Sequence, residues 1–299
     1  MRVAIQGESI PYPIAVLRGK LRLSGVPYLE TEEIISEVLA TSSKRPPTEQ
    51  TVTKLARDRL KSHHSAALPR FDILIEYDLS RSADRALPPV VLVLEGASAT
   101  GKSMLSLPMI LNLAATRVIG TDTIRQVLRA VYSERDHPEL YCHTYQAYEY
   151  RQVGPKELSP IVRGYLAQCE LIEPVVRDLV ERIAQEGADA VIEGVHIRPG
   201  TLKGLSAGVT EAVVEPGEDS HRAMFMTKHA AAKLRTVSGD HATREREFQA
   251  TRLIQEYLVD MARRAGVHIL QLSDYDQAEK DICNLVVESA KRIIEMGGK

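Results

Sequence analysis

Residues 96–103 carry the clearest chemical pattern in the chain and read Gly-Ala-Ser-Ala-Thr-Gly-Lys-Ser. The run matches G-x-x-x-x-G-K-[ST], in which the glycines free the backbone to turn several amides toward one anion. The lysine of such a loop reaches the β- and γ-phosphates of a nucleotide, and the serine hydroxyl binds Mg²⁺. We therefore expect nucleotide phosphates to be bound by Gly96, Ala97, Ser98, Ala99, Thr100, Gly101, Lys102 and Ser103, with Ser103 also a metal ligand.

The sequence on either side of this loop predicts a strand before it and a helix after it, as a phosphate-binding loop requires. A valine-rich apolar run, Val90 to Leu94, comes before it, and a helical pattern comes after it. A helix that begins at the loop adds the positive end of its dipole to the anion site. A chance glycine-rich turn is the alternative, and the presence of strand, loop and helix together argues against it.

A second group of reactive side chains follows the apolar run 117–120. It contains Asp122 and, one helical turn later, Arg125. Asp122 is expected to orient the hydroxyl of an acceptor or to take its proton, and Arg125 to bind an anionic group of that substrate. The alternative is that Thr121 or Asp122 only caps a helix, and the two roles are compatible.

A third group follows the apolar run 190–193. Glu193 ends this run, where an acid can hold Mg²⁺ or polarise a hydroxyl, and an ordinary strand-end acid is the alternative. His196 and Arg198 come next, and together they suit an acidic or phosphorylated substrate. A structural histidine is the alternative for His196.

Basic residues are frequent between Lys228 and Arg252. Arginines that cover a phosphate loop neutralise the charge that builds up on a transferred phosphoryl group. The lid candidates are Arg235, Arg244 and Arg246, with Arg244 also expected to be catalytic. A solvated, charged helix face is the alternative. For the tyrosine-rich stretch 141–150, substrate binding and packing both remain open.

The elements that must position these groups alternate along the chain from Val90 onward. Short apolar runs at 90–94, 117–120, 190–193, 211–214 and 267–272 predict strands, and helical patterns predict helices over 158–185, 240–265 and 277–296. Such alternation is typical of a parallel sheet, whose sites lie outside the carboxyl ends of the strands. The expected fold is α/β, a P-loop kinase with a parallel five-stranded core sheet flanked by helices.

The first part of the chain is predicted to be separate from this domain. Residues 1–66 carry helical patterns at 14–24, 30–40 and 51–61, which indicate a small helical module. A strand over 71–77 and a polar linker are expected within 67–89, and the kinase domain within 90–299.

Composition excludes several other classes. Of the 299 residues, 44% are hydrophobic and the net charge is −2, which predicts a globular chain that recruits neither nucleic acid nor a membrane. The first residues carry no signal-peptide pattern, and the three cysteines have no metal-ligand spacing, so a cytoplasmic protein is expected. The sequence leaves open whether the chain forms a homo-oligomer.

Four segments together resemble one known family, the 2-phosphoglycerate kinases. They are 119–129, 141–145, 191–200 and 248–257, and the resemblance extends to 17–61, which is similar to an ATP-cone segment. The resemblance implies that ATP and Mg²⁺ are used, that 2-phosphoglycerate becomes 2,3-diphosphoglycerate, and that Asp122, Arg125, Glu193 and His196 surround the acceptor. Archaeal members often lack a lysine at the position of Lys102, so the resemblance leaves the acceptor open.

Three hypotheses therefore remain at this point. The first is an ATP-dependent small-molecule kinase that acts on 2-phosphoglycerate. The second keeps the same site with another phosphorylated or polyol acceptor, because basic side chains demand an anion but no particular one. The third is a non-catalytic, nucleotide-sensing regulator, against which the strand-end acids and the arginines argue.

Overall fold

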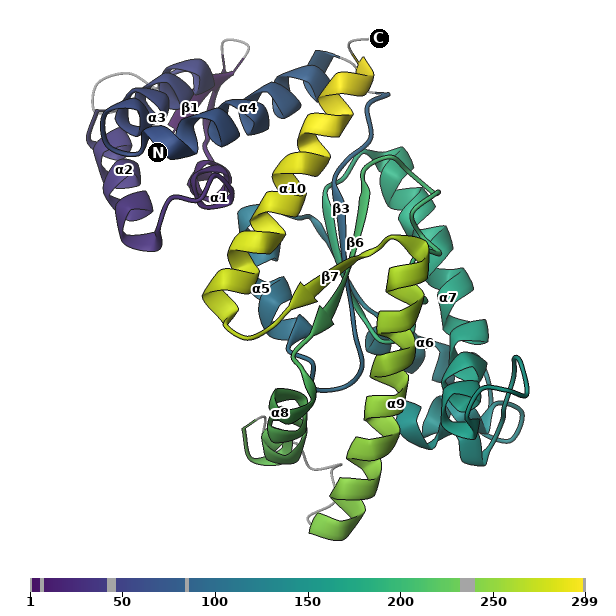
Figure 1. Cartoon of the computed structure of the whole chain (residues 1–299). Coiled ribbons are helices and arrows are strands. Elements are labelled where there is room, and N and C mark those ends of the chain that lie inside the picture. The colour runs from purple at the N-terminus through teal and green to yellow at the C-terminus, as the bar shows by residue number, and fades with distance from the viewer. Residues whose placement is uncertain (1, 6–7, 42–46, 84–85, 232–239, 298–299) are drawn as a thin grey trace.

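The computed structural model describes residues 2–5, 8–41, 47–83, 86–231 and 240–297 (Figure 1). At its centre is a parallel sheet of five strands in the order β4-β5-β3-β6-β7. The strands are β3 (Val91–Glu95), β4 (Arg117–Gly120), β5 (Ala190–Gly194), β6 (Val209–Glu215) and β7 (His268–Gln271). Every predicted strand of the kinase domain is present, with ends shifted by at most two residues, and the expected α/β fold is confirmed.

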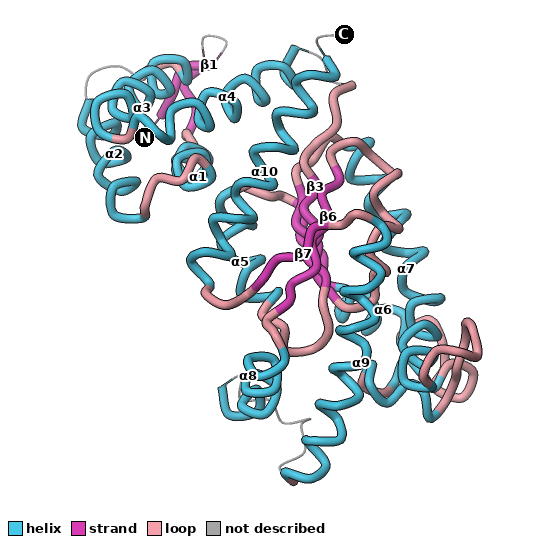
Figure 2. The backbone as a smooth tube through the Cα atoms, in the orientation of Figure 1, coloured by secondary structure: helices cyan, strands magenta, loops and turns pink. Residues whose placement is uncertain are grey.

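Helices cover both faces of this sheet, as Figure 2 shows. One face is covered by α5 (Lys102–Asn112) and α10 (Tyr275–Gly297), the other by α6 (Thr121–Arg129), α7 (Pro160–Glu186) and α9 (His241–Ala265). Strand β3 alternates between the two cores: Leu92 and Leu94 pack toward α5 and α10, while Val91 and Val93 pack toward α6 and α7. All residues of β3 and β6 are buried, as expected for central strands of a parallel sheet.

Shorter elements stand at the carboxyl ends of the strands. Two 3₁₀ turns, η2 (Pro138–Tyr141) and η3 (Thr144–Glu149), lie between α6 and α7, and α8 (Glu218–Ala231) follows β6. Helix α7 is continuous across Pro174, and Gly187 ends it with a φ of 69°. Within the part of the chain that the structure describes, no helix is long and apolar enough to cross a membrane.

The N-terminal segment has its own small core. A hairpin of β1 (Arg2–Ile5) and β2 (Glu8–Pro11) precedes α1 (Ile14–Leu23), α2 (Tyr28–Thr41), α3 (Glu49–His63) and the 3₁₀ turn η1 (Ser65–Ala67). The three predicted helices are present. Their apolar faces meet in one cluster, and the Thr48 hydroxyl caps α3 by accepting the Thr51 amide at 3.2 Å.

The strand predicted over residues 71–77 is wrong. These residues belong to α4 (Leu68–Ala83), where Phe71, Leu74 and Tyr77 share one buried face. Phe71 packs in the N-terminal core, whereas Leu74 and Tyr77 pack in the core of the sheet beside α10. The predicted strand-and-linker segment 67–89 is therefore helical over residues 68–83, and this helix joins the two cores (Figure 1).

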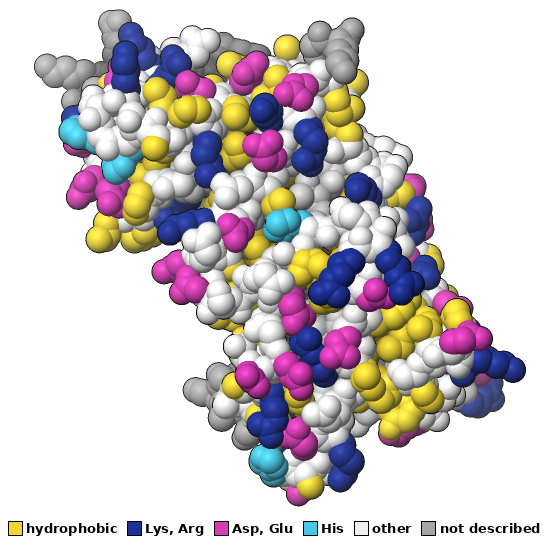
Figure 3. Space-filling view, in the orientation of Figure 1, with side chains coloured by type: hydrophobic (Ala, Val, Ile, Leu, Met, Phe, Trp, Pro, Cys, Tyr) yellow, Lys and Arg dark blue, Asp and Glu magenta, His cyan; other side chains and the backbone are white. Residues whose placement is uncertain are grey.

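Charge is mixed over the molecular surface. On the face in Figure 3, basic and acidic side chains are interspersed, which accords with the net charge of −2.

A buried pair of carboxyl groups lies within the sheet, directly behind the loop 96–103. Glu95 ends β3 and is 0% exposed, and Glu211 of the neighbouring β6 is 7% exposed. Burial, together with the adjacent Glu211 carboxyl, raises the pKa of Glu95 well above its ordinary value. The folded protein therefore holds a proton here that the unfolded chain releases at lower pH.

This pair predicts a pH dependence of stability. Because the folded pKa is raised, the unfolded state binds fewer protons above the ordinary carboxyl pKa, so stability falls as pH rises through that window, by about 1.4 kcal/mol per pH unit for one group. A Glu95→Gln variant is expected to have a flatter profile of unfolding free energy against pH, measured by urea denaturation. Glu288→Gln, on an exposed site of α10, is the control and should keep the wild-type slope. An unchanged slope in Glu95→Gln would contradict the assignment.

Candidate functional site

The loop between β3 and α5 has the backbone geometry of a phosphate cradle. Gly101 precedes α5 with a φ of 88°, and a Cβ there would lie 2.5 Å from Leu272 Cδ2, so only glycine fits. Ala99 also has a positive φ, 63°. The loop thus ends at the positive N-terminus of α5, where Lys102 donates from Nζ to the Ala97 carbonyl at 3.1 Å.

Side chains from helices distant in the sequence hold this loop in place, and no sequence pattern predicted them. Gln255 of α9 accepts the Ala97 amide at 2.9 Å and donates to the Val214 carbonyl at 2.9 Å. His221 of α8 is fully buried and contacts the Ser98 carbonyl through Nε2 at 2.8 Å. The loop is therefore fixed to β6, α8 and α9 as well as to its own helix.

Glu193 and Ser103 lie together beside the loop. Strand β5 pairs with β3 so that Glu193 stands opposite Leu94, and the Ser103 hydroxyl donates to Glu193 Oε2 at 3.1 Å. Carboxylate and hydroxyl oxygens are hard ligands of the kind Mg²⁺ takes, one or two at a time, together with nucleotide phosphates. The two oxygens of Ser103 and Glu193 therefore fit Mg²⁺ that is shared with a nucleotide. Among the described residues no group of three or more His, Cys, Asp or Glu could hold a metal ion.

Asp122 and Arg125 face the loop from the start of α6. Arg125 bonds Asp122 Oδ1 at 3.2 Å and donates to the Cys142 carbonyl at 2.6 Å. Partial desolvation opposes ionisation of the Asp122 carboxyl, but the positive charges of Arg125, Lys102 and Lys228 outweigh it and lower the pKa. Asp122 is therefore an ionised carboxylate, ready to accept a hydrogen bond or a proton.

A cavity of about 330 Å³ joins these groups. Its wall includes His143–Tyr145, part of the stretch 141–150 for which the sequence left substrate binding and packing both open. The sequence analysis did not single out Lys228 of α8, which also lines the cavity and whose Nζ donates to Ser98 Oγ at 2.9 Å. Burial, followed by the nearby Lys102, lowers the pKa of Lys228. The remaining lining residues are Ala97, Ser98, Ala99, Gly101, Lys102, Ser103, Met104, Asp122, Arg125, Glu193, Val195, Thr251 and Ile254.

Two residues of the predicted substrate group do not line this cavity. His196 is fully buried behind its wall, where burial lowers its pKa to about 3. Arg198 forms a two-pronged ion pair with Glu173 at 2.8 and 3.0 Å and borders a different pocket, along α7. The structure therefore brings Arg125, but neither His196 nor Arg198, within reach of Lys102.

Two of the three lid candidates, Arg244 and Arg246, do not line the cavity. Arg235 lies outside the described residues. Arg244 is 4% exposed, donates to the Phe225 carbonyl, and stacks 4.0 Å from the centre of the Phe225 ring. Arg246 donates to Thr243 Oγ1 on the surface of α9 at 3.0 Å. In this arrangement Arg244 serves packing between α8 and α9, and among the described residues of this region Lys228 is the basic side chain that lines the cavity.

Comparison with known proteins finds relatives along most of the chain. No family model matches the chain. A protein from Methanopyrus kandleri named 2-phosphoglycerate kinase is 25% identical over 292 residues, covering 96% of this chain and 86% of that protein. The resemblance to the 2-phosphoglycerate kinases is confirmed. Proteins of the same name from Thermococcus kodakarensis (23% identity, 96% of each chain) and Methanocaldococcus jannaschii (28%, covering 70% of this chain and 67% of that one) also match.

The similarity to these relatives, which are named as kinases, extends along most of the chain and supports an enzyme of the kinase class. The prediction of a phosphotransferase is thereby confirmed, and with it the use of a nucleotide. The 2-phosphoglycerate kinases that match include the N-terminal segment in their alignments, since two of the matches cover 96% of the chain.

Proposed function

We propose that the protein transfers the γ-phosphoryl group of ATP to the free hydroxyl of 2-phosphoglycerate, giving ADP and 2,3-diphosphoglycerate. The observation that carries the proposal is that Asp122 and Arg125 face the phosphate loop across one cavity. A carboxylate and a guanidinium at that position suit an acceptor that has both a hydroxyl and an anionic group. The names of the relatives supply the particular acceptor.

On the donor side, the loop amides and Lys102 would bind the β- and γ-phosphates of ATP. Ser103 and Glu193 would hold Mg²⁺, which when bound neutralises charge on the β- and γ-phosphates. Their oxygens lie 3.1 Å apart and border the cavity beside Lys102, which supports this role.

On the acceptor side, Asp122 would accept the hydroxyl proton as the acceptor oxygen bonds to the γ-phosphorus. The bond from that phosphorus to the β–γ bridging oxygen breaks, and ADP leaves with the electron pair. Arg125 would bind an acceptor anion, and Lys228, which contacts the phosphate loop through Ser98, would neutralise charge between donor and acceptor.

The proposal is tested by incubating the protein with γ-labelled ATP, Mg²⁺ and 2-phosphoglycerate and identifying the labelled product. Labelled 2,3-diphosphoglycerate is expected. 3-Phosphoglycerate, glycerate and a polyol such as glycerol serve as competing acceptors. Faster transfer to one of them would favour the second hypothesis, and ATP binding without transfer to any acceptor would favour the regulator.

Replacement of Lys228 is expected to weaken catalysis more than nucleotide binding. A Lys228→Met variant should lose about 10²-fold in kcat/KM for the acceptor, because one preorganised charge at the transferred group is removed. Steady-state kinetics with varied acceptor and varied ATP measure the two effects. Lys203→Met, on an exposed site, is the control and should match the wild type. Equal rates in Lys228→Met and the control would contradict this role.

A further inference from the structure

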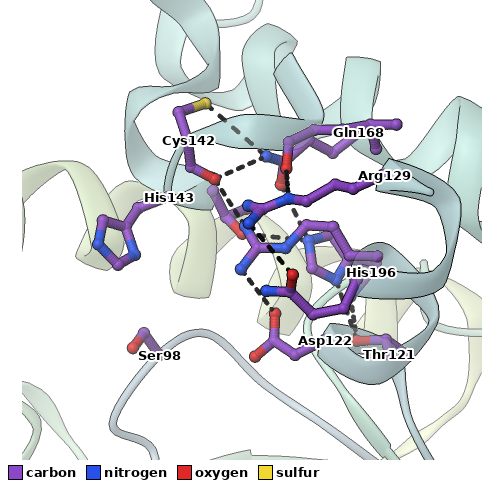
Figure 4. A network of polar contacts seen from close by, with 12 residues as sticks. Ser98, Thr121, Asp122, Arg129, Cys142, His143, Gln168 and His196 are labelled. Carbon is purple, nitrogen blue, oxygen red and sulfur yellow. Dashed lines mark hydrogen bonds and ion pairs between the residues drawn. The ribbon is translucent and has the colours of Figure 1, made fainter. Parts of the chain in front are cut away.

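The ring of His196 is the centre of a buried polar network behind the cavity wall. Its Nδ1 lies 3.0 Å from Thr121 Oγ1, and its Nε2 lies 2.9 Å from Gln168 Oε1 and 3.1 Å from Thr144 Oγ1. Figure 4 shows the contacts of His196 with Thr121 and Gln168 as dashed lines, with Asp122 beside Thr121 at the edge of the network. Three separate elements, α6, α7 and η3, thus meet on one side chain that follows β5.

The network fixes which ring nitrogen carries the proton. The Gln168 amide nitrogen donates to the Glu139 carbonyl at 2.5 Å and to the Cys142 carbonyl at 3.4 Å, so its oxygen must face the histidine. An oxygen there accepts, which requires a hydrogen on His196 Nε2. In the neutral ring Nδ1 is then the acceptor, and the Thr121 hydroxyl donates to it.

The same network also includes Asp122 and Arg125, the two residues proposed to face the acceptor. Thr121 is the residue before Asp122, and the Cys142 carbonyl that receives Gln168 also receives Arg125 at 2.6 Å. Asp122 bonds Arg125 in turn. A closed ring of contacts therefore runs from the start of α6 through His196 and Gln168 to the segment Cys142–Tyr145, and back through Arg125.

Glycines allow these elements to approach so closely. A Cβ at Gly194, at the end of β5, would lie 1.9 Å from Thr121 Oγ1. A Cβ at Gly164 of α7 would lie 2.1 Å from the backbone nitrogen of Tyr148 in η3. Both distances are far below van der Waals contact, so the sequence at these two positions permits the tight packing that the network needs.

We propose that His196 is a positioning residue for the acceptor: it holds Cys142–Tyr145 against the start of α6, so that Asp122 and Arg125 present one fixed geometry. The inference rests on the proposed function for the identity of the acceptor. His196 does not touch the substrate, because its ring is fully buried, and it transfers no proton, because both ring nitrogens are bonded inside the protein.

The variants His196→Asn and His196→Gln separate the two sides of the ring. The asparagine amide overlays Nδ1 and keeps a partner for Thr121, whereas the glutamine amide overlays Nε2 and keeps a partner for Gln168 and Thr144. His196→Asn is expected to raise the acceptor KM by about 10- to 100-fold, because a small misplacement of a binding segment costs that much. The ATP KM should stay within about twofold, the pH profile of kcat should keep its shape, and His196→Gln should recover part of the loss.

A matched comparison comes from His221, which among the described residues is a second buried histidine in contact with a site segment. His221 bonds the Ser98 carbonyl of the phosphate loop, so His221→Asn is expected to raise the ATP KM and leave the acceptor KM nearly unchanged. Equal rises of both KM values in His196→Asn, or loss of an ionisation from its pH profile, would overturn the positioning role.

A second measurement does not depend on the acceptor. Amide hydrogen exchange over residues 139–146 should accelerate about tenfold or more in His196→Asn, while exchange over 96–103 stays at the wild-type rate. If the wild type transfers nothing to 2-phosphoglycerate, the proposed function fails, and the exchange rates alone decide the role of His196. Should His196→Asn not fold, Thr144→Val removes one half-exposed partner and should show the same selective acceleration. Unchanged exchange over 139–146 would overturn the inference.

Discussion

A Lys102→Met variant is expected to lose about 10³-fold in kcat for phosphoryl transfer. The ammonium stands at the positive end of α5, and in the proposed mechanism it follows the charge that the γ-phosphoryl group develops during transfer. Methionine keeps the length of the side chain and removes the charge, so the effect reports electrostatics rather than packing. Coupled ADP release at saturating ATP and acceptor measures kcat, and calorimetric titration measures nucleotide affinity.

The control for this prediction is Lys291→Met, which removes a lysine from an exposed site on α10. Melting temperatures of both variants should match the wild type, because Lys102 makes one bond to a carbonyl of its own loop. A Lys102→Met variant that keeps more than a tenth of wild-type kcat would mean that the loop amides and the basic side chains Arg125 and Lys228 suffice without it.

The sheet was predictable because each of its strands contains a short run of consecutive apolar residues, the longest being Val91–Leu94 of β3. The error at residues 71–77 has a physical origin. Apolar residues at 71, 73, 75 and 77 fit a period of two, while those at 71, 74 and 77 fit a helix, and packing on two cores decides for the helix. The hairpin of β1 and β2 escaped detection because β2 is exposed along its whole length and carries no alternating pattern.

The site was predictable where it depends on short-range sequence. The phosphate loop, Asp122 and Glu193 all stand at strand ends, and the parallel sheet brings strand ends together. Lys228 was not singled out, and the role of 141–150 was left open, because the place of these residues at the cavity depends on how α8 and η3 pack, which no local pattern encodes. Proximity in sequence also led to a wrong prediction for His196 and Arg198, which follow Glu193 closely. The His196 side chain lies in the core, and the Arg198 side chain pairs with Glu173 of α7, so neither lines the cavity.

The lid prediction shows that the positions of charged residues in the sequence do not reveal what their side chains contact in the fold. An arginine-rich stretch predicts a surface that meets phosphate, but the guanidinium of Arg244 lies on the Phe225 ring with Glu247 at 3.0 Å. A flat guanidinium packs on an aromatic face about as readily as it binds an anion, and sequence does not distinguish the two environments. The division of the chain into two domains near residue 66 remains a prediction. Helix α4 packs in both cores, so a domain boundary must either fall within α4 or place the whole helix in one of the two domains.

An Asp122→Asn variant is expected to lose about 10²- to 10⁴-fold in kcat, the range that a general base contributes. Asparagine has the same shape and can still accept a hydrogen bond from the acceptor hydroxyl, but it cannot take the proton. The acceptor KM should therefore change by less than about threefold. Asp58→Asn, on an exposed site of α3, is the control and should behave as the wild type.

The pH dependence separates the base from a simple orienting group. Because the basic surroundings lower the pKa of Asp122, the wild-type carboxylate stays ionised below the ordinary range for aspartate, and kcat should decline with acid only beneath that range. The Asp122→Asn variant should lack this acid limb and stay low at every pH. A rise in acceptor KM with kcat preserved would instead assign Asp122 to binding, and the proton would then leave through solvent or the phosphoryl oxygens.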